Sequence, residues 1–113
     1  MPIYHITQKN IWNNTQKDGA YYPESLDTEG FIHCSQRDQI IGSASRYFSG
    51  QSGLVLLCIE SSLVRAEIRF ENLMGGEQLY PHIYGPLNLD AVLKVSDFEA
   101  DSQGIFHLPE ETH

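Results

Sequence analysis

Three short segments of the sequence each place a histidine among residues that favour β-strands, and histidine is a common catalytic side chain because its ordinary pKa lies near neutral pH. The three are His5, His33 and His82. Side chains alternate between the two faces of a strand, so His5 is expected to share a face with Thr7, and His33 with Ser35. We predict that the first two strands are neighbours and that the three histidines form one catalytic site.

The third segment, residues 80–84, surrounds its histidine with tyrosines. Tyr80, His82 and Tyr84 share a face if this segment is extended, and such a surface suits stacking on a flat ring and hydrogen bonding to its polar edge. We therefore predict that both tyrosines bind the ligand. Pro81 cannot donate to a ladder, which predicts an edge strand or a loop rim.

Two further features suggest ligand contacts. Residues 18–30 are rich in turn formers and too long for a hairpin turn, which is typical of a functional loop, and Tyr22 in this loop is a candidate ligand-binding residue. Ser35 and Asp38 resemble a capping box at the start of a helix, and with Arg37 in its first turn that start could receive a phosphate. The tyrosine could equally anchor the loop, and the capping pair could be structural only.

The histidines and the cysteine next to one of them also have simpler structural interpretations. A strand histidine is often a half-buried side chain that a backbone carbonyl satisfies. A three-histidine metal site is less favoured, because no two of the histidines have the short local spacing of metal ligands, and no metal is predicted. Cys34 is expected to be a buried, unreactive thiol, and the sequence has no G-x-S-x-G motif for a serine nucleophile.

The elements that must position these residues are predicted to form a single α+β domain over residues 1–108, followed by an acidic, weakly ordered end at 109–113. Residues 54–59 form a continuous apolar run, which predicts a central strand covered on both faces. Two main helices are expected at 8–16 and 35–49. The other predicted strands are residues 3–7, 31–34, 67–70, 80–84, 91–95 and 105–108.

Composition limits the partners. The chain has 113 residues, of which 15 are acidic and 7 basic, giving a formal charge of −8, so a long nucleic acid is excluded as a partner. Five of the acidic residues lie in residues 96–113, so the remainder is nearly balanced and a nucleotide-like ligand is compatible with it. Two cysteines are too few for a disulfide framework, and no apolar run is long enough to span a membrane, so a cytoplasmic protein is expected.

Several motifs occur in a fixed order along the chain. They are Ile3-Tyr4-His5-Ile6, Gly30-Phe31-Ile32-His33-Cys34-Ser35, the helix at 39–48, Leu54-Val55-Leu56-Leu57 and Pro81-His82-Ile83-Tyr84-Gly85-Pro86-Leu87. Together these motifs resemble a family of small bacterial proteins known as DUF952, a domain of unknown function. The resemblance runs in order over residues 3–95, with Phe70-Glu71 where the family commonly has a tryptophan before a glutamate.

The resemblance implies an ADP-ribosyltransferase-like split sheet, because the family has been grouped by fold with those enzymes. It implies NAD as a substrate, with His5 at a ribose hydroxyl, and His33 and Ser35 at the nicotinamide end. His82 stands where such an enzyme would have its catalytic glutamate. The expected function is therefore binding of NAD or an ADP-ribose-type ligand, with transferase or NAD glycohydrolase activity. The alternative is a non-catalytic module that binds a small molecule or a partner on the same fold.

Overall fold

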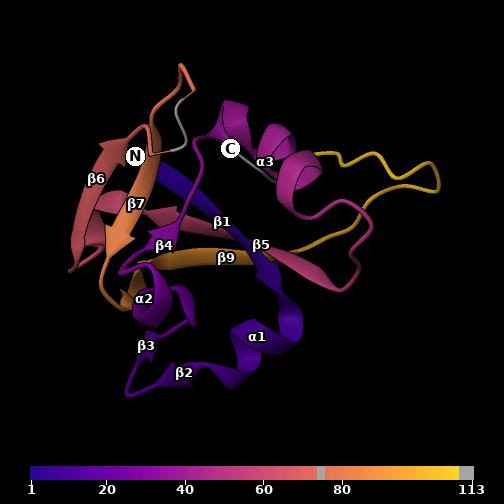
Figure 1. The fold of residues 1–113 in the computed structure, drawn as a ribbon. Helices are drawn as coiled ribbons and strands as arrows, with labels where there is room; N and C mark the ends of the chain where they lie inside the picture. Colours follow the sequence, from indigo (N-terminus) through magenta and orange to yellow (C-terminus); the bar gives the residue numbers. More distant parts are fainter. Residues whose placement is uncertain (74–75, 110–113) are drawn as a thin grey trace.

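The computed structural model describes residues 1–73 and 76–109, which form three small antiparallel sheets with helices between them (Figure 1). This confirms the predicted α+β class. The helices are α1 (Lys9–Asn14), α2 (Ser25–Thr28) and α3 (Ile40–Tyr47), with 3-10 turns η1 (Arg37–Gln39), η2 (Ser61–Leu63) and η3 (Leu89–Ala91). The strands are β1 (Pro2–Gln8), β2 (Gln16–Lys17), β3 (Ala20–Tyr21), β4 (Ile32–His33), β5 (Leu54–Glu60), β6 (Glu67–Glu71), β7 (Tyr80–Tyr84), β8 (Leu87–Asn88) and β9 (Val92–Phe98).

Sheet A has the order β1-β5-β9, and its central strand β5 explains the unbroken apolar run. Side chains on one face of β5 pack into a first core together with residues of the other two sheets. Side chains on its opposite face pack into a second core with α3 and the segment after β9. Because both faces of β5 are covered, apolar residues are needed at successive positions, which confirms the prediction for residues 54–59.

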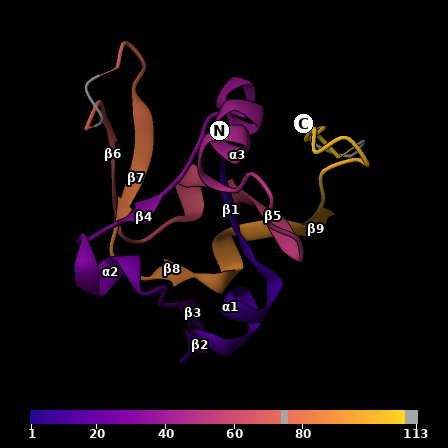
Figure 2. The same ribbon diagram turned by 45° about the vertical axis from the view of Figure 1, so that its right-hand side comes forward.

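Sheet B has the order β2-β3-β8 and sheet C the order β4-β7-β6. Figure 2 shows β6 and β7 to one side of sheet A, with β3 and β8 below. Sheets A and C are joined by a bridge between Tyr4 and Ser35, whose backbone amides and carbonyls exchange hydrogen bonds of 2.9 and 2.7 Å. The three sheets therefore meet around the middle of β1.

Strand β7 is the centre of sheet C, so the prediction that Pro81 marks an edge strand was wrong. The reason lies in the shortness of β4, which pairs with β7 only at Ile32 and His33. The carbonyl of Pro81 accepts from the Cys34 amide at 3.0 Å, just beyond these pairs. The C=O and the absent N–H of Pro81 both face β4, beyond the last β4–β7 pair. The β6–β7 ladder, in which Pro81 lies opposite Phe70, therefore loses no hydrogen bond.

The helix predictions were right in place and wrong in extent. The first helix starts after Gln8 and not at it, because β1 continues through Gln8. Before α3, the capping contact is made by Gln39, whose side chain accepts from the Gln36 amide at 2.9 Å, and not by Ser35 and Asp38. Ser35 is instead held in the bridge to β1.

The predicted last strand, residues 105–108, is limited to one bridge between Ala100 and Phe106. Apart from residue 109, the predicted weakly ordered end lies outside the described residues. In the part of the chain that is described, no helix combines the length and apolar character needed to cross a bilayer.

The central position of β5 predicts the effect of a truncation. Leu57 is fully buried, whereas Leu93 on β9 is 60% exposed. We expect Leu57→Ala to lower the free energy of unfolding by about 2–5 kcal/mol, because it removes buried methyl groups and leaves a cavity between sheets. Leu93→Ala, the matched control, should lower it by less than about 1 kcal/mol. Urea unfolding measures both, and equal losses would contradict the assigned position of β5.

Candidate functional site

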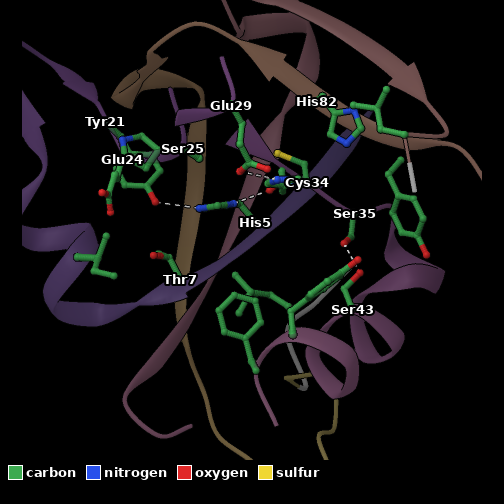
Figure 3. Close-up of a pocket in the computed structure, with 18 of the residues that line it drawn as sticks. His5, Thr7, Tyr21, Glu24, Ser25, Glu29, Cys34, Ser35, Ser43 and His82 are labelled. Carbon is green, nitrogen blue, oxygen red and sulfur yellow. Dashed lines mark hydrogen bonds and ion pairs between the residues drawn. The ribbon is translucent and has the colours of Figure 1, made fainter. Parts of the chain in front are cut away.

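A cavity of about 510 Å³ lies where the three sheets meet, close to the middle of β1 (Figure 3). Its wall is formed by β1, by some of the residues in and around α2, by the ends of the sheet C strands, and by the side of α3. All three predicted catalytic histidines line it. The other lining residues are Ile6, Thr7, Ile11, Tyr21, Pro23, Glu24, Ser25, Glu29, Cys34, Ser35, Ser43, Tyr47, Phe48, Glu71, Leu73 and Tyr80.

His5 is held by the protein at both ring nitrogens. Its Nδ1 donates to the His33 carbonyl at 2.6 Å, since a carbonyl can only accept, so the neutral ring leaves Nε2 as an acceptor. The Tyr21 hydroxyl donates to this Nε2 at 2.9 Å. Burial lowers the pKa of His5 to about 4, so the ring is neutral near pH 7 and this single tautomer persists.

Tyr21 in turn is fixed from three sides. Its ring packs at 5.1 Å from the Trp12 ring, and its hydroxyl also bonds to Thr7. Burial raises the pKa of Tyr21 to about 12, which keeps its proton available for His5. A direct ligand contact by His5 requires Tyr21 to move. The simpler interpretation, a strand histidine satisfied by a backbone carbonyl, thus describes His5 as it stands.

His33 and His82 form the second feature of the site. They are direct partners across β4 and β7, and their rings lie perpendicular at 5.5 Å between centroids. The Phe31 ring packs against both, with centroid distances of 4.8 Å to His33 and 4.6 Å to His82, and thereby helps to fix the angle between the two imidazoles. His33 is half exposed, whereas only 5% of the His82 side chain is accessible.

Each of these two histidines has a carboxylate partner. Glu29 lies 3.0 Å from His33 Nε2, directly after α2, and Gly30 follows with a left-handed φ of 87° that turns the chain into β4. Glu71 lies 3.1 Å from His82 Nδ1 and also accepts from the Tyr84 hydroxyl at 2.5 Å. The hydrogen bonds from Tyr84 and His82 lower the pKa of Glu71, so it is ionised near neutral pH.

The pair of His82 and Glu71 has the arrangement of a general base. Burial lowers the pKa of His82, the nearby His33 acts in the same direction, and Glu71 opposes both without reversing the shift. The neutral ring donates from Nδ1 to Glu71, which leaves a lone pair on Nε2. Such a nitrogen can accept a proton or a hydrogen bond from a molecule in the cavity.

The structure brings together five of the eight residues predicted for the site, while their roles stay predictions. His5, His33, Ser35, Tyr80 and His82 line the cavity. Ser35 and Ser43 share a hydrogen bond of 3.0 Å between their hydroxyls.

The three remaining predicted residues lie elsewhere. Tyr22 is 44% exposed and does not line the cavity. Arg37 lines a separate depression beside Met1 and Phe70. Tyr84 does not line the cavity, but its hydroxyl donates a hydrogen bond to Glu71, which does.

Sequence reasoning missed the partners of the histidines. Glu29 and Tyr21 were not singled out within the loop at 18–30, and Glu71 was named only in a family motif and not as a partner of His82. For Glu71 a signal existed, because strand alternation places Glu67, Arg69 and Glu71 on one face. Its meeting with His82 depends on the register of β6 and β7, which the sequence alone does not give. Within the described ranges, no group of three or more potential ligands is arranged to hold a metal ion.

The buried state of His5 has a consequence for stability. Its pKa of about 4 in the folded chain lies below the ordinary 6.5, so the unfolded chain binds the extra proton first. Stability is then complete above about pH 6.5 and falls as the pH drops toward 4, by up to about 3 kcal/mol from this residue. We expect His5→Gln to be less stable at pH 7 but to lose less on acidification, as measured by urea unfolding across this range. Equal pH slopes for the two proteins would contradict the neutral, doubly bonded His5.

Comparison with known proteins defines the family. The model of a family described as "Protein of unknown function (DUF952)" matches residues 6–95. A crystal structure of protein CC0527 from Caulobacter crescentus is 30% identical, with a TM-score of 0.83 over 96% of this chain and 95% of that one. A solution NMR structure of CC0527 gives 0.77, at 30% identity over 92% and 90%. No curated protein matches. The chain therefore belongs to the DUF952 family, as its histidine motifs suggested.

Proposed function

We propose that the cavity binds the nicotinamide-ribose end of NAD or a related ribosyl ligand, and that His82 and Glu71 act on it. The observation that carries this proposal is the convergence of His33 and His82, each with its own carboxylate, on one cavity. Its volume of about 510 Å³ is within the usual range for small-molecule sites. The family resemblance supplies the ligand class, together with the ADP-ribosyltransferase-like fold that it implies.

The side chains suit each part of such a ligand. Ribose hydroxyls are donors, and His82 Nε2 offers them an acceptor at the end of a partly apolar cavity. The ring of Tyr80 lines the same wall and can pack on a flat heterocycle. His5 acts as a positioning residue, because it holds the backbone of His33 and the side chain of Tyr21 in place.

The proposed reaction is cleavage of the bond between ribose C1′ and the nicotinamide nitrogen. The bonding electron pair leaves with nicotinamide, and positive charge develops on the ribose. The ionised Glu71 lines the cavity, where its negative charge can stabilise the ribose, and it also fixes the tautomer of His82. A hydroxyl acceptor or water then attacks C1′, and His82 Nε2 takes its proton. No strong nucleophile is needed for such a step.

One observation favours a second candidate, a binding module without catalysis. Among the cavity residues that the structure describes, none is Lys or Arg, so the site offers no cationic side chain to a pyrophosphate. A ligand without phosphates, held and not transformed, fits that lining better than a whole dinucleotide. Turnover separates the two candidates.

Titration calorimetry with nicotinamide riboside and with NAD, followed by an assay for released nicotinamide, tests the proposal. We expect the wild-type protein to bind and release nicotinamide, and His82→Gln to lose release and to bind at least about tenfold more weakly, because the acceptor at Nε2 is gone. His107→Gln, an exposed histidine outside the cavity, is the matched control.

Absence of heat and of a thermal shift at millimolar ligand would refute NAD-type binding. Binding that depends on His82 without any nicotinamide release would select the non-catalytic module. Equal effects of His82→Gln and His107→Gln would mean that the cavity is not the site.

A further inference from the structure

The charges around the cavity all have one sign. Its described lining includes the carboxylates of Glu24, Glu29 and Glu71 and no Lys or Arg side chain. Arg69 on the same sheet helps to lower the pKa of Glu71, but its guanidinium is bound at 3.0 Å to Glu67 and lies over the Tyr84 ring, outside the lining. A ligand in this cavity therefore meets carboxylates and hydroxyl groups, and no Lys or Arg side chain among the described lining residues.

We propose that the cavity is a recognition site for a small organic cation with N–H donors, of the amidinium, guanidinium or ammonium class, attached to a flat apolar group. This inference concerns the same cavity as the proposed function but does not depend on NAD chemistry. It names the charge and the hydrogen-bonding character of whatever molecule occupies the site, whether as a bound ligand or as a second substrate.

A buried nitrogen points to a ligand independently of the carboxylates. The His82 side chain is 95% buried, since 5% of it is accessible, and Glu71 occupies its Nδ1. No described residue bonds to its Nε2. Among the described residues, no side-chain nitrogen is both inaccessible to solvent and without a hydrogen-bond partner. The unpartnered Nε2 is therefore accessible, and His82 lines the cavity. A neutral imidazole held in this tautomer accepts one hydrogen bond there, and an N–H cation supplies it.

The remaining walls suit the rest of such a ligand. Tyr47, Phe48 and Tyr80 line the cavity and offer rings against which a cation or a flat group can pack. Ile6, Leu73 and other apolar residues exclude water from parts of the wall, which strengthens charge interactions inside. A phosphate or carboxylate would meet repulsion from the glutamates with no cationic side chain to offset it.

The test holds shape constant and changes charge. Benzamidine is a cation, benzamide is neutral and benzoate is an anion, and all three carry one planar group on a phenyl ring. Binding to the full chain is followed by amide chemical shifts at neutral pH and low salt. We expect benzamidine to bind about tenfold more tightly than benzamide, with shifts at His82 and Tyr80, and benzoate to bind most weakly.

The double variant Glu29→Gln/Glu71→Gln tests the source of the preference. Each glutamine keeps an oxygen that can accept from its histidine, so the local hydrogen bonds survive while two charges are removed. We expect the preference for benzamidine to fall to about threefold or less. The control Glu67→Gln removes a charge from the same strand outside the cavity, and it should retain the full preference.

Three results would overturn the inference. They are equal binding of benzamidine and benzamide, no binding of any probe at millimolar concentration, and a full preference in the double variant, which would assign the effect to the net charge of the protein. Outcomes for the proposed function are separable. Benzamidine binding without any response to nicotinamide riboside or NAD would support the cation site and refute the NAD proposal. Nicotinamide release without a charge preference would do the reverse.

Discussion

A single imidazole joins the three sheets of this protein, and the cavity depends on it. His5 belongs to sheet A, bonds through Nδ1 to the His33 carbonyl on sheet C, and accepts through Nε2 from Tyr21 on sheet B. Buried hydrogen bonds of this kind contribute only modestly when they are made, but a buried ring nitrogen left without a partner is costly. The neutral ring needs one acceptor and one donor, and the positions of β4 and β3 supply them. The relative positions of sheets A, B and C are therefore all constrained by the hydrogen bonds of this one ring.

Because both ring nitrogens of His5 are bonded within the protein, only the other two histidines can offer a ring nitrogen to a molecule in the cavity. The bond to the His33 carbonyl fixes the backbone of β4, and β4 then sets His33 opposite His82 on β7. Strand β6 adds Glu71 beside His82, so neighbouring strands of one sheet hold the imidazole and its carboxylate. The difference between His5 and His82 therefore lies in which ring nitrogens are already hydrogen-bonded, and not in the residue type. His5 has no free ring nitrogen, whereas His82 keeps Nε2.

Local sequence signals predicted the elements better than their pairing. The apolar run of β5 and the β-strand at residues 80–84 are visible in the sequence, and both are confirmed. The central position of β7 was missed because the absent N–H of a proline weakens a sheet only where a neighbouring strand needs that donor. Whether a neighbour needs it depends on the length of β4. The capping residues were misplaced for a similar reason, since Ser35 is claimed by a bridge to a distant strand.

The same limit explains why the histidines were found and their partners were not. A histidine in a β-rich segment is conspicuous, but its carboxylate partner is not. The register of β6 and β7 places Glu71 within 3.1 Å of the His82 ring, and the turn at Gly30 places Glu29 within 3.0 Å of the His33 ring. Those carboxylates decide what the imidazoles can do, because a carboxylate fixes which ring nitrogen carries the proton. The same carboxylates also make the electrostatic potential in the cavity negative. Motifs that stop at the histidines therefore locate the site without specifying its ligand. The acidic partners carry that information, because their charge and their place beside the two rings set which molecules the cavity can hold.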